Sequence, residues 1–294
     1  MKNILLSTLL SSLLLTSGLY AKSDIKSVTD VNKGAVAKGT QDALANQKKL
    51  IKEAVKSLEF TNNALIALSK NDTKSAQADI EKALGKLEVI LSAKDAPKLL
   101  PIDSSVTMVE FVGTKDDVTH TLDSVKDLLK HNKVQAARVL LNSLQSEIDV
   151  TVVSLPLVTY PDALKLAAKY IHDNQVQKAK SVLEVALSTF DKTTTVIPLP
   201  LLKATDLINV SASLSKNGKK EEALKYLQAA EDQLDVAEAL GYVSHSSTTY
   251  KAMHTAIQKV RKEIKGKNKA EKLFDELKNE LKDFKNKIFS EKAK

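Results

Sequence analysis

An internal repeat constrains the fold of this 294-residue chain more than any other feature of its sequence. Residues 132–157 recur at residues 174–199, an offset of 42 positions. The matched pairs are Asn132 and Asn174, Ala137 and Ala179, Leu141 and Leu183, Ser146 and Ser188, Asp149 and Asp191, Thr151 and Thr193, Pro156 and Pro198, and Leu157 and Leu199. A fixed period of this length is typical of stacked helical units, whose surfaces hold other molecules. The repeat therefore favours a binding protein over an enzyme.

Helical hairpins are the predicted unit of this repeat. Helices are predicted over residues 40–69, 73–91, 122–130, 134–148, 163–172, 176–190, 202–216 and 219–240. The turns between helices carry asparagines that tolerate left-handed backbone angles, at Asn71, Asn132, Asn174 and Asn217. An early alanine in each second helix lets two antiparallel helices approach closely. Residues 214–227 resemble a tetratricopeptide hairpin, although the period here exceeds the roughly 34 residues of that repeat.

Extended segments are predicted between the hairpins, where all six prolines lie. Residues 104–112, 150–160 and 193–199 are apolar and rich in β-branched side chains, and the prolines exclude a helix interior. We predict an all-α fold of about four tandem antiparallel hairpins, joined by proline-rich extended segments that could pair as short strands. The apolar residues of these segments are either core or an exposed binding surface. The candidates for that surface are Leu155, Pro156, Leu157, Tyr160, Ile197, Pro198 and Leu199.

The N-terminus has the features of a secretory signal peptide over residues 1–21. Lys2 precedes an apolar stretch of 12 residues, and small residues up to Ala21 suit a cleavage site. A membrane anchor is the alternative, but a spanning helix needs about 20 apolar residues. We expect cleavage after Ala21 and a soluble exported protein. A flexible leader over residues 22–40 and a helical repeat domain over residues 41–249 are predicted to follow.

The basic charge of the chain belongs to its C-terminal tail. Residues 22–250 carry 29 basic and 29 acidic side chains, whereas residues 251–294 carry 14 basic and 7 acidic ones. Residues 250–294 are predicted to form a charged amphipathic helix or helical hairpin, which either packs on the body or contacts an anionic surface. Its second apolar seam has coiled-coil spacing and is a candidate for self-association into a homo-oligomer. This seam consists of Phe274, Leu277, Leu281, Phe284 and Ile288.

The sequence holds no motif that indicates catalysis, a metal or a cofactor. The five histidines form no metal-binding pair on one helix, and the chain has neither a phosphate-binding glycine loop, nor a Gly-x-Ser-x-Gly elbow, nor a cysteine. Nucleic-acid binding is not expected of an exported chain whose body is neutral. An enzyme that uses a carboxylate between repeats is the least favoured hypothesis, and we expect no cofactor.

Several segments resemble those of one protein family. Residues 197–208 (IPLPLLKATDLI), 214–223 (LSKNGKKEEA) and 227–232 (LQAAED), together with residues 69–83, resemble the YfdX family of exported bacterial proteins. The resemblance covers about residues 40–242, and the tail after Tyr250 goes beyond the family's usual length. It implies a mostly helical periplasmic protein without known catalysis, associated with acid and envelope stress and chaperone-like. It provides no active-site residues.

The function expected from these features is non-catalytic binding of client proteins or envelope components under stress. The alternative is a structural or assembly scaffold at the cell envelope, docking through its hairpins or its basic tail. Low pH could trigger the client binding of the first hypothesis. The 36 carboxylates would be neutralised at low pH while basic residues stay charged, which would loosen the body and expose apolar connections to clients.

Overall fold

The computed structural model describes residues 26–45, 49, 51–244, 248–266 and 270–291, and the predicted signal peptide lies outside these residues. The described chain is mostly helical, as predicted, with eleven helices and three strands. The elements are α1 (Val28–Ala45), α2 (Lys52–Ser69), α3 (Thr73–Leu91), β1 (Leu99–Val109), α4 (Lys115–Lys130), α5 (Val134–Ser143), β2 (Glu147–Pro156), α6 (Tyr160–His172), α7 (Val176–Ala186), β3 (Asp191–Pro198), α8 (Leu199–Lys216), α9 (Lys220–Ala239), α10 (Thr248–Lys265) and α11 (Glu271–Glu291).

The predicted extended segments are the three strands of one antiparallel sheet. They are longer than the short strands we expected, with 11, 10 and 8 residues. The strand order is β1-β2-β3, and Glu147 at the start of β2 lies opposite Val109 of β1 and Pro198 of β3. Valines and threonines fill the paired positions because β-branched side chains pack well on a pleated surface. Pro156 and Pro198 end their strands, since a proline cannot donate a ladder hydrogen bond.

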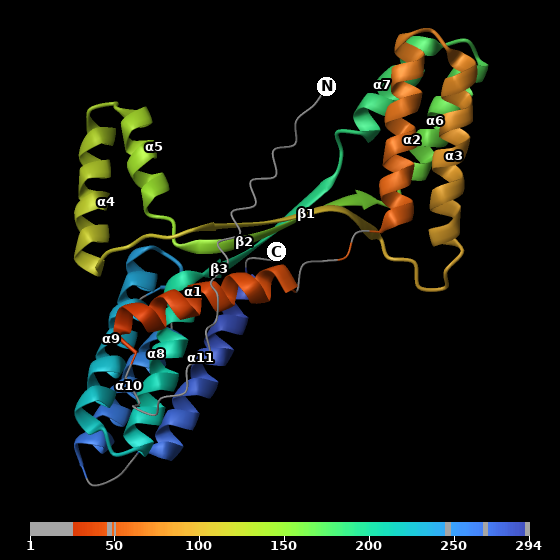
Figure 1. The fold of residues 1–294 in the computed structure, drawn as a ribbon. Coiled ribbons are helices and arrows are strands. Elements are labelled where there is room, and N and C mark those ends of the chain that lie inside the picture. The colour runs from red at the N-terminus through yellow and green to blue at the C-terminus, as the bar shows by residue number, and fades with distance from the viewer. Residues whose placement is uncertain (1–25, 46–48, 50, 245–247, 267–269, 292–294) are drawn as a thin grey trace, which may run out of the picture.

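Helical hairpins alternate between the two ends of this sheet (Figure 1). Each strand follows one hairpin and leads to the next, and neighbouring strands run in opposite directions. Hairpins α2–α3 and α6–α7 therefore share one end, where α3 contacts α6 and α2 contacts α7. Hairpins α4–α5 and α8–α9 lie at the other end. In a simple tandem array, each hairpin would stack on the next. Here successive hairpins lie at opposite ends of the sheet, because the strands that join them are antiparallel.

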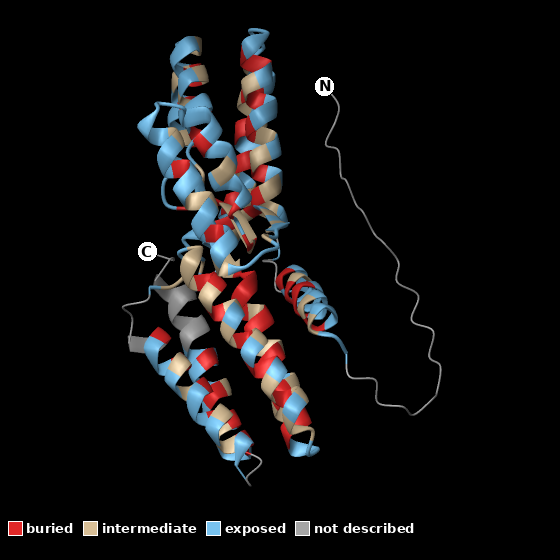
Figure 2. Ribbon diagram, turned by 90° about the vertical axis from the view of Figure 1, so that its left-hand side faces the viewer, coloured by how far each residue is buried: buried red, intermediate tan, exposed pale blue. Residues whose placement is uncertain are grey.

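Two large helical cores lie at the two ends of the sheet, and a smaller one lies between them. One large core fills the α2–α3–α6–α7 bundle and includes Leu100 and Leu155 from the strands. The other joins α1, α8, α9, α10 and α11. A small third core connects α1 to Ile148 and Leu199. Buried residues accordingly form stripes along the helices, with exposed residues on the opposite faces (Figure 2).

The N-terminal part of the chain corrects two predictions. Residues 28–45 form helix α1, which packs on α8, so the expected flexible leader over residues 22–40 is wrong for residues 28–40. The helix predicted over residues 40–69 is two helices, since α1 ends at Ala45 and α2 begins at Lys52. Val31, Ala35 and Val36 are buried, and tertiary contact with α8 explains how a polar segment is held as a helix.

The C-terminal tail forms the helical hairpin α10–α11, and it packs on the body. Helix α10 contacts α9, and helix α11 contacts α8. Met253, Ile257 and Val260 are completely buried in the core that they share with α8 and α9. Among the described helices, none combines the length and the apolar character that a bilayer-spanning helix needs.

Candidate functional site

An open apolar pocket lies between helices α6 and α7, at the outer side of the α2–α3–α6–α7 bundle. Its volume is about 510 Å³. The pocket is lined by Pro156, Thr159, Tyr160, Asp162, Ala163, Leu166, Ser181, Val182, Val185, Ala186 and Thr189. Most of these side chains are apolar, and Asp162 is the single carboxylate among them. A cavity of this size and lining accommodates an apolar group in a largely preformed site.

The strand-to-helix junction after β2 positions the floor of this pocket. The backbone N–H of Leu157 donates to the carbonyl of Lys98 at 2.9 Å, which fixes the end of β2 to the start of β1. Helix α6 then begins at Tyr160, with a proline in its first turn whose fixed φ favours helix initiation. Tyr160 is buried, and its ring lies 6.4 Å from the ring of Phe190. Burial raises the pKa of Tyr160 to about 12.

The pocket walls come from residues spaced along one face of each helix. Thr159, Ala163 and Leu166 lie three to four positions apart on α6, and Val182 and Val185 do so on α7. Leu166 is 41% exposed and Val185 is 59% exposed. Such exposure means that these two apolar side chains contribute little to the core and remain available to a bound molecule.

The other copy of the repeat lacks three of these apolar residues but keeps others, since Val182 corresponds to Leu140 and Ser181 to Val139, which is 69% exposed. At the offset of 42 residues, Ala163 corresponds to Thr121, Leu166 to Ser124 and Val185 to Ser143. Both hairpins have the same helix–turn–helix form, and their turns have the same left-handed asparagine, with φ 58° and 57°. The fold of the hairpin therefore does not require apolar residues at these positions. Leu166 and Val185 therefore distinguish the surface of α6 and α7 from that of the other repeat.

The structure divides the predicted apolar surface into core and pocket. Leu155, Leu157, Pro198 and Leu199 are buried, so their prediction as an exposed binding surface is wrong. These four residues lie at the junctions where β2 leads into α6 and β3 leads into α8. Pro156 and Tyr160 do line the pocket, while Ile197 is half-buried in the small core beside α1. The sequence reasoning missed Leu166 and Val185. A comparison of the two repeats would have found them, because their counterparts in the first repeat are the serines Ser124 and Ser143.

The predicted self-association seam is internal. Phe274, Leu277 and Leu281 are at most 1% exposed and belong to the core that α11 shares with α8, so their prediction as a docking surface is wrong. Phe284 and Ile288 lie outside the residues whose side chains are described. The same 3-4 spacing serves a helix that packs within its own chain and a coiled coil between chains, and here the body supplies the partner.

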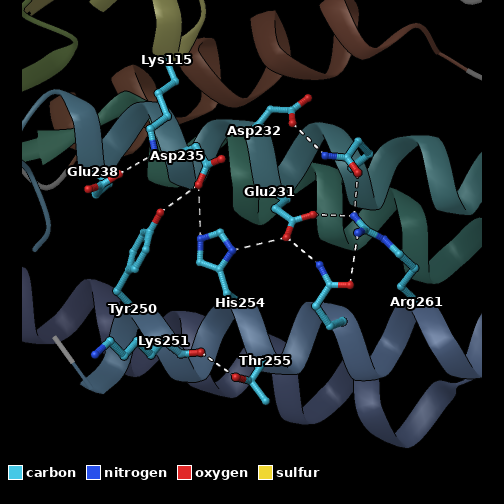
Figure 3. A network of polar contacts seen from close by, with 12 residues as sticks. Lys115, Glu231, Asp232, Asp235, Glu238, Tyr250, Lys251, His254, Thr255 and Arg261 are labelled. Atoms are coloured by element: carbon cyan, nitrogen blue, oxygen red, sulfur yellow. Dashed lines mark hydrogen bonds and ion pairs between the residues drawn. The ribbon is translucent and has the colours of Figure 1, made fainter. Parts of the chain in front are cut away.

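A polar network joins α10 to α9 and to the start of α4 (Figure 3). His254 lies between two carboxylates, with Nδ1 3.3 Å from Glu231 Oε1 and Nε2 3.4 Å from Asp235 Oδ1. Tyr250 donates its hydroxyl to Asp235 at 2.8 Å, and burial raises the pKa of Tyr250. Arg261 pairs with Glu231 at 2.5 Å. These groups partner one another, so the network attaches the tail hairpin to the body.

Lys115 extends this network to helix α4. Its ammonium group lies 2.9 Å from Glu238 Oε2, and this contact raises the pKa of Lys115. A second, more polar cavity of about 370 Å³ opens beside Lys115, Tyr250 and His254. In the described part of the chain, no group of three histidine, aspartate or glutamate side chains is arranged to hold a metal ion.

One family model matches part of this chain. The family model described as YfdX protein matches residues 57–196, which run from α2 into β3 and contain the pocket. A solved structure of YfdX from Salmonella Typhi is similar to this chain at 14% sequence identity. That match covers 51% of this chain and 93% of the other, with a TM-score of 0.36. No curated protein matches the sequence.

Proposed function

We propose that this chain, whose residues 57–196 belong to the YfdX family, is a non-catalytic exported protein that binds apolar segments of client proteins under acid or envelope stress. The family resemblance read from the sequence is confirmed over that segment. The observation that carries the proposal is the open apolar pocket between α6 and α7. Client binding, a chaperone-like action and a periplasmic location are parts of the proposal.

The pocket suits an unfolded segment better than a small polar substrate. A volume of about 510 Å³ lies within the range of roughly 300–1,000 Å³ that is usual for ligand sites. Its apolar walls offer burial to a few aliphatic or aromatic side chains, and each buried methylene contributes about 0.8 kcal/mol. Thr159, Asp162 and Thr189 are polar groups in the lining, able to hydrogen-bond the backbone of a bound segment. Non-directional apolar contact with few polar groups allows many different clients.

Acidification is the proposed trigger for client binding. Residues 22–250 have balanced charges at neutral pH and become strongly positive when their carboxylates are protonated. Glu231, Asp235 and Glu238 are carboxylates whose ion pairs join α9 to α10 and α4. Loss of negative charge across the body leaves its basic residues to repel one another, so the body becomes looser in acid, where clients unfold.

The role of the pocket in client binding is tested by replacing two of its apolar residues with the serines that the other repeat has at these positions. We expect wild-type protein to suppress light scattering from an acid-unfolded client at about pH 4, and to bind the apolar dye ANS. The double variant Leu166→Ser and Val185→Ser should lose most of both activities. The matched control, Ile66→Ser and Val89→Ser, changes two exposed apolar residues of the same bundle outside the pocket and should retain both.

Two outcomes contradict the proposal. Equal scattering with and without wild-type protein at about pH 4 and about pH 7 would refute client protection. Full protection by the Leu166→Ser and Val185→Ser variant would place client binding elsewhere on the molecule. The alternative function, a scaffold at the cell envelope, loses the tail seam as a docking surface, because Phe274, Leu277 and Leu281 are buried.

A further inference from the structure

The basic charge of the C-terminal tail is concentrated on helix α10 and the residues directly after it. Residues 251–269 carry seven basic side chains and one carboxylate. Residues 270–294, which contain α11, carry seven basic and six acidic side chains. The excess of positive charge in the tail therefore belongs almost entirely to its first half.

Four lysines of α10 form a stripe on the outer face of the helix. The inner face packs on α9 and α11 through a buried seam of Met253, Ile257, Val260 and Ile264. The lysine stripe consists of Lys251, Lys259, Lys262 and Lys265, all of which are exposed. With about 3.6 residues per turn, these positions lie on the side of the helix opposite the seam. At about 1.5 Å per residue, the stripe is about 21 Å long.

The carboxylates around α10 lie away from this stripe. Glu231 and Asp235 of α9 lie against His254, and Glu231 also pairs with Arg261 (Figure 3). Arg261 is therefore directed toward α9 and does not belong to the stripe. Glu263, the single carboxylate of α10, is half-buried. Among the described side chains of α10, the exposed charged ones are all lysines, so the outer face presents positive charge alone.

The needs of a solvated helix do not explain the whole stripe. The described side chains of α11, up to residue 283, include two exposed lysines and five exposed carboxylates, so the neighbouring helix is solvated with both signs of charge. The helix dipole accounts for Lys262 and Lys265, which lie in the last turn of α10. It disfavours Lys251 near the start of the helix, and it does not extend to Lys259.

We propose that the lysine stripe of α10 binds the surface of a bilayer that contains anionic phospholipid. Lysine suits this partner because its ammonium group is a compact charge, which a diffuse layer of headgroup phosphates attracts without the bidentate geometry that arginine provides. Tyr250, the aromatic residue of α10, is buried, so the outer face lacks the stacking platform on which single-stranded nucleic acids bind. The contact is peripheral and lies along one face of a helix.

This contact goes beyond client binding and does not depend on it. The client pocket lies between α6 and α7, whereas α10 packs on α9 at the other end of the sheet (Figure 1). Variants of the lysine stripe should therefore protect an acid-unfolded client as well as wild type does. Failure of the membrane contact and failure of the client pocket are thus separate results.

Vesicle co-sedimentation tests the membrane contact. The protein is the chain without its predicted signal peptide, residues 22–294, which keeps every described residue. Vesicles of equal parts phosphatidylglycerol and phosphatidylcholine should bind this protein at low ionic strength, and vesicles of phosphatidylcholine alone should not. Binding should decrease as salt is added, because salt screens the attraction between the lysines and the headgroups.

Charge removal from two faces of the tail locates the contact. Each lysine near an anionic surface raises the partition coefficient about fivefold, so Lys259→Gln with Lys262→Gln should bind roughly 25-fold more weakly. The matched control, Lys272→Gln with Lys282→Gln, removes two exposed lysines from α11 and should bind within about threefold of wild type. Glutamine has a helix propensity close to that of lysine, and far-ultraviolet circular dichroism verifies the fold. Lys259→Arg with Lys262→Arg keeps the charge and should bind as wild type does.

Three outcomes would overturn the membrane proposal. Equal binding to both kinds of vesicle, or to neither, would show that headgroup charge does not recruit the protein. Equal losses from the α10 and α11 glutamine variants would show that net charge, rather than the lysine stripe, determines binding. Binding to a DNA duplex without binding to the anionic vesicles would assign the stripe to a nucleic acid.

Discussion

At the scale of single residues, the left-handed turn asparagines define the hairpins. Asn71, Asn132 and Asn174 have φ of 58°, 58° and 57°, and glycine takes this role in the fourth hairpin, where Gly218 has φ 77°. In each case the next residue donates its N–H back into the preceding helix, as from Gln175 to the carbonyl of Tyr170 at 2.7 Å. This pattern satisfies carbonyls that the end of a helix leaves without partners.

Replacing a turn asparagine with alanine should destabilise the protein. We expect Asn174→Ala to lower the free energy of unfolding by about 1 kcal/mol. A Cβ atom is disfavoured at positive φ, and alanine lacks the side-chain amide with which asparagine offsets that cost by local hydrogen bonding. Asn174→Gly should be close to neutral, because glycine adopts this conformation freely. Urea unfolding measures both changes. Asn142→Ala, at an exposed position inside α5, is the control and should not destabilise; an equal loss there would contradict the turn argument.

The capping carboxylates give a residue-scale pH dependence. Asp72 accepts a hydrogen bond from the backbone N–H of Ser75 at 3.0 Å, and hydrogen bonds from Ser75 hold the pKa of Asp72 below its usual value. A carboxyl group whose pKa is lower in the folded state stabilises the fold at a pH above the unfolded value. That contribution is lost as the pH falls through the folded pKa.

A serine at position 72 keeps the capping oxygen and removes the titration. We expect Asp72→Ser to unfold at a lower urea concentration than wild type at about pH 6, and the gap to narrow at about pH 3. Unfolding followed by circular dichroism at the two pH values measures the gap. A gap that stays constant or widens in acid would mean that the charge of Asp72 does not stabilise helix α3.

At the scale of elements, the tail hairpin is a structural part of the body. Phe274 is 1% exposed and packs in the core that α11 shares with α8. We expect Phe274→Ala to cost about 3–5 kcal/mol of stability, as for other buried phenylalanines, and to leave the mass of the protein in solution unchanged. Urea unfolding and sedimentation measure the two effects.

A half-buried aromatic residue provides the control for this substitution. Phe60→Ala, in helix α2, removes a ring that lies 5.5 Å below the ammonium group of Lys82 and should cost less than half as much. If Phe274→Ala instead lowers the mass of the protein in solution with little loss of stability, the seam joins copies of the chain and the internal packing of α11 is wrong.

At the scale of the whole molecule, the antiparallel sheet determines which hairpins meet. It brings α2–α3 to α6–α7, although a strand and the α4–α5 hairpin separate them in sequence. It also sends α4–α5 to the end that α1 and the tail hairpin occupy. The pocket and the α4–α5 hairpin thus lie at opposite ends of the sheet (Figure 1).

Local sequence patterns predicted the hairpins and their turns but not their arrangement. The spacing of Ile80, Ala83 and Leu87 and the turn at Asn71 are local signals, and they correctly indicated the helices. Strand pairing depends on register between distant segments, so the sheet was expected only as short strands. Helix α1 was missed because its buried residues, such as Val31 and Ala35, are stabilised by contact with α8 rather than by a strong apolar pattern. Pro156 and Tyr160 were the predicted site residues that line the pocket.

The central claim, that clients bind between α6 and α7, is tested most directly by site-specific photo-cross-linking. A photoreactive residue is placed at position 185 in one protein and at position 143, its counterpart in the other repeat, in a second protein. Each is irradiated with an acid-unfolded client, and client adducts are separated by mass from adducts between copies. We predict strong client adducts from position 185 and few from position 143. Equal client adducts from both positions would contradict it.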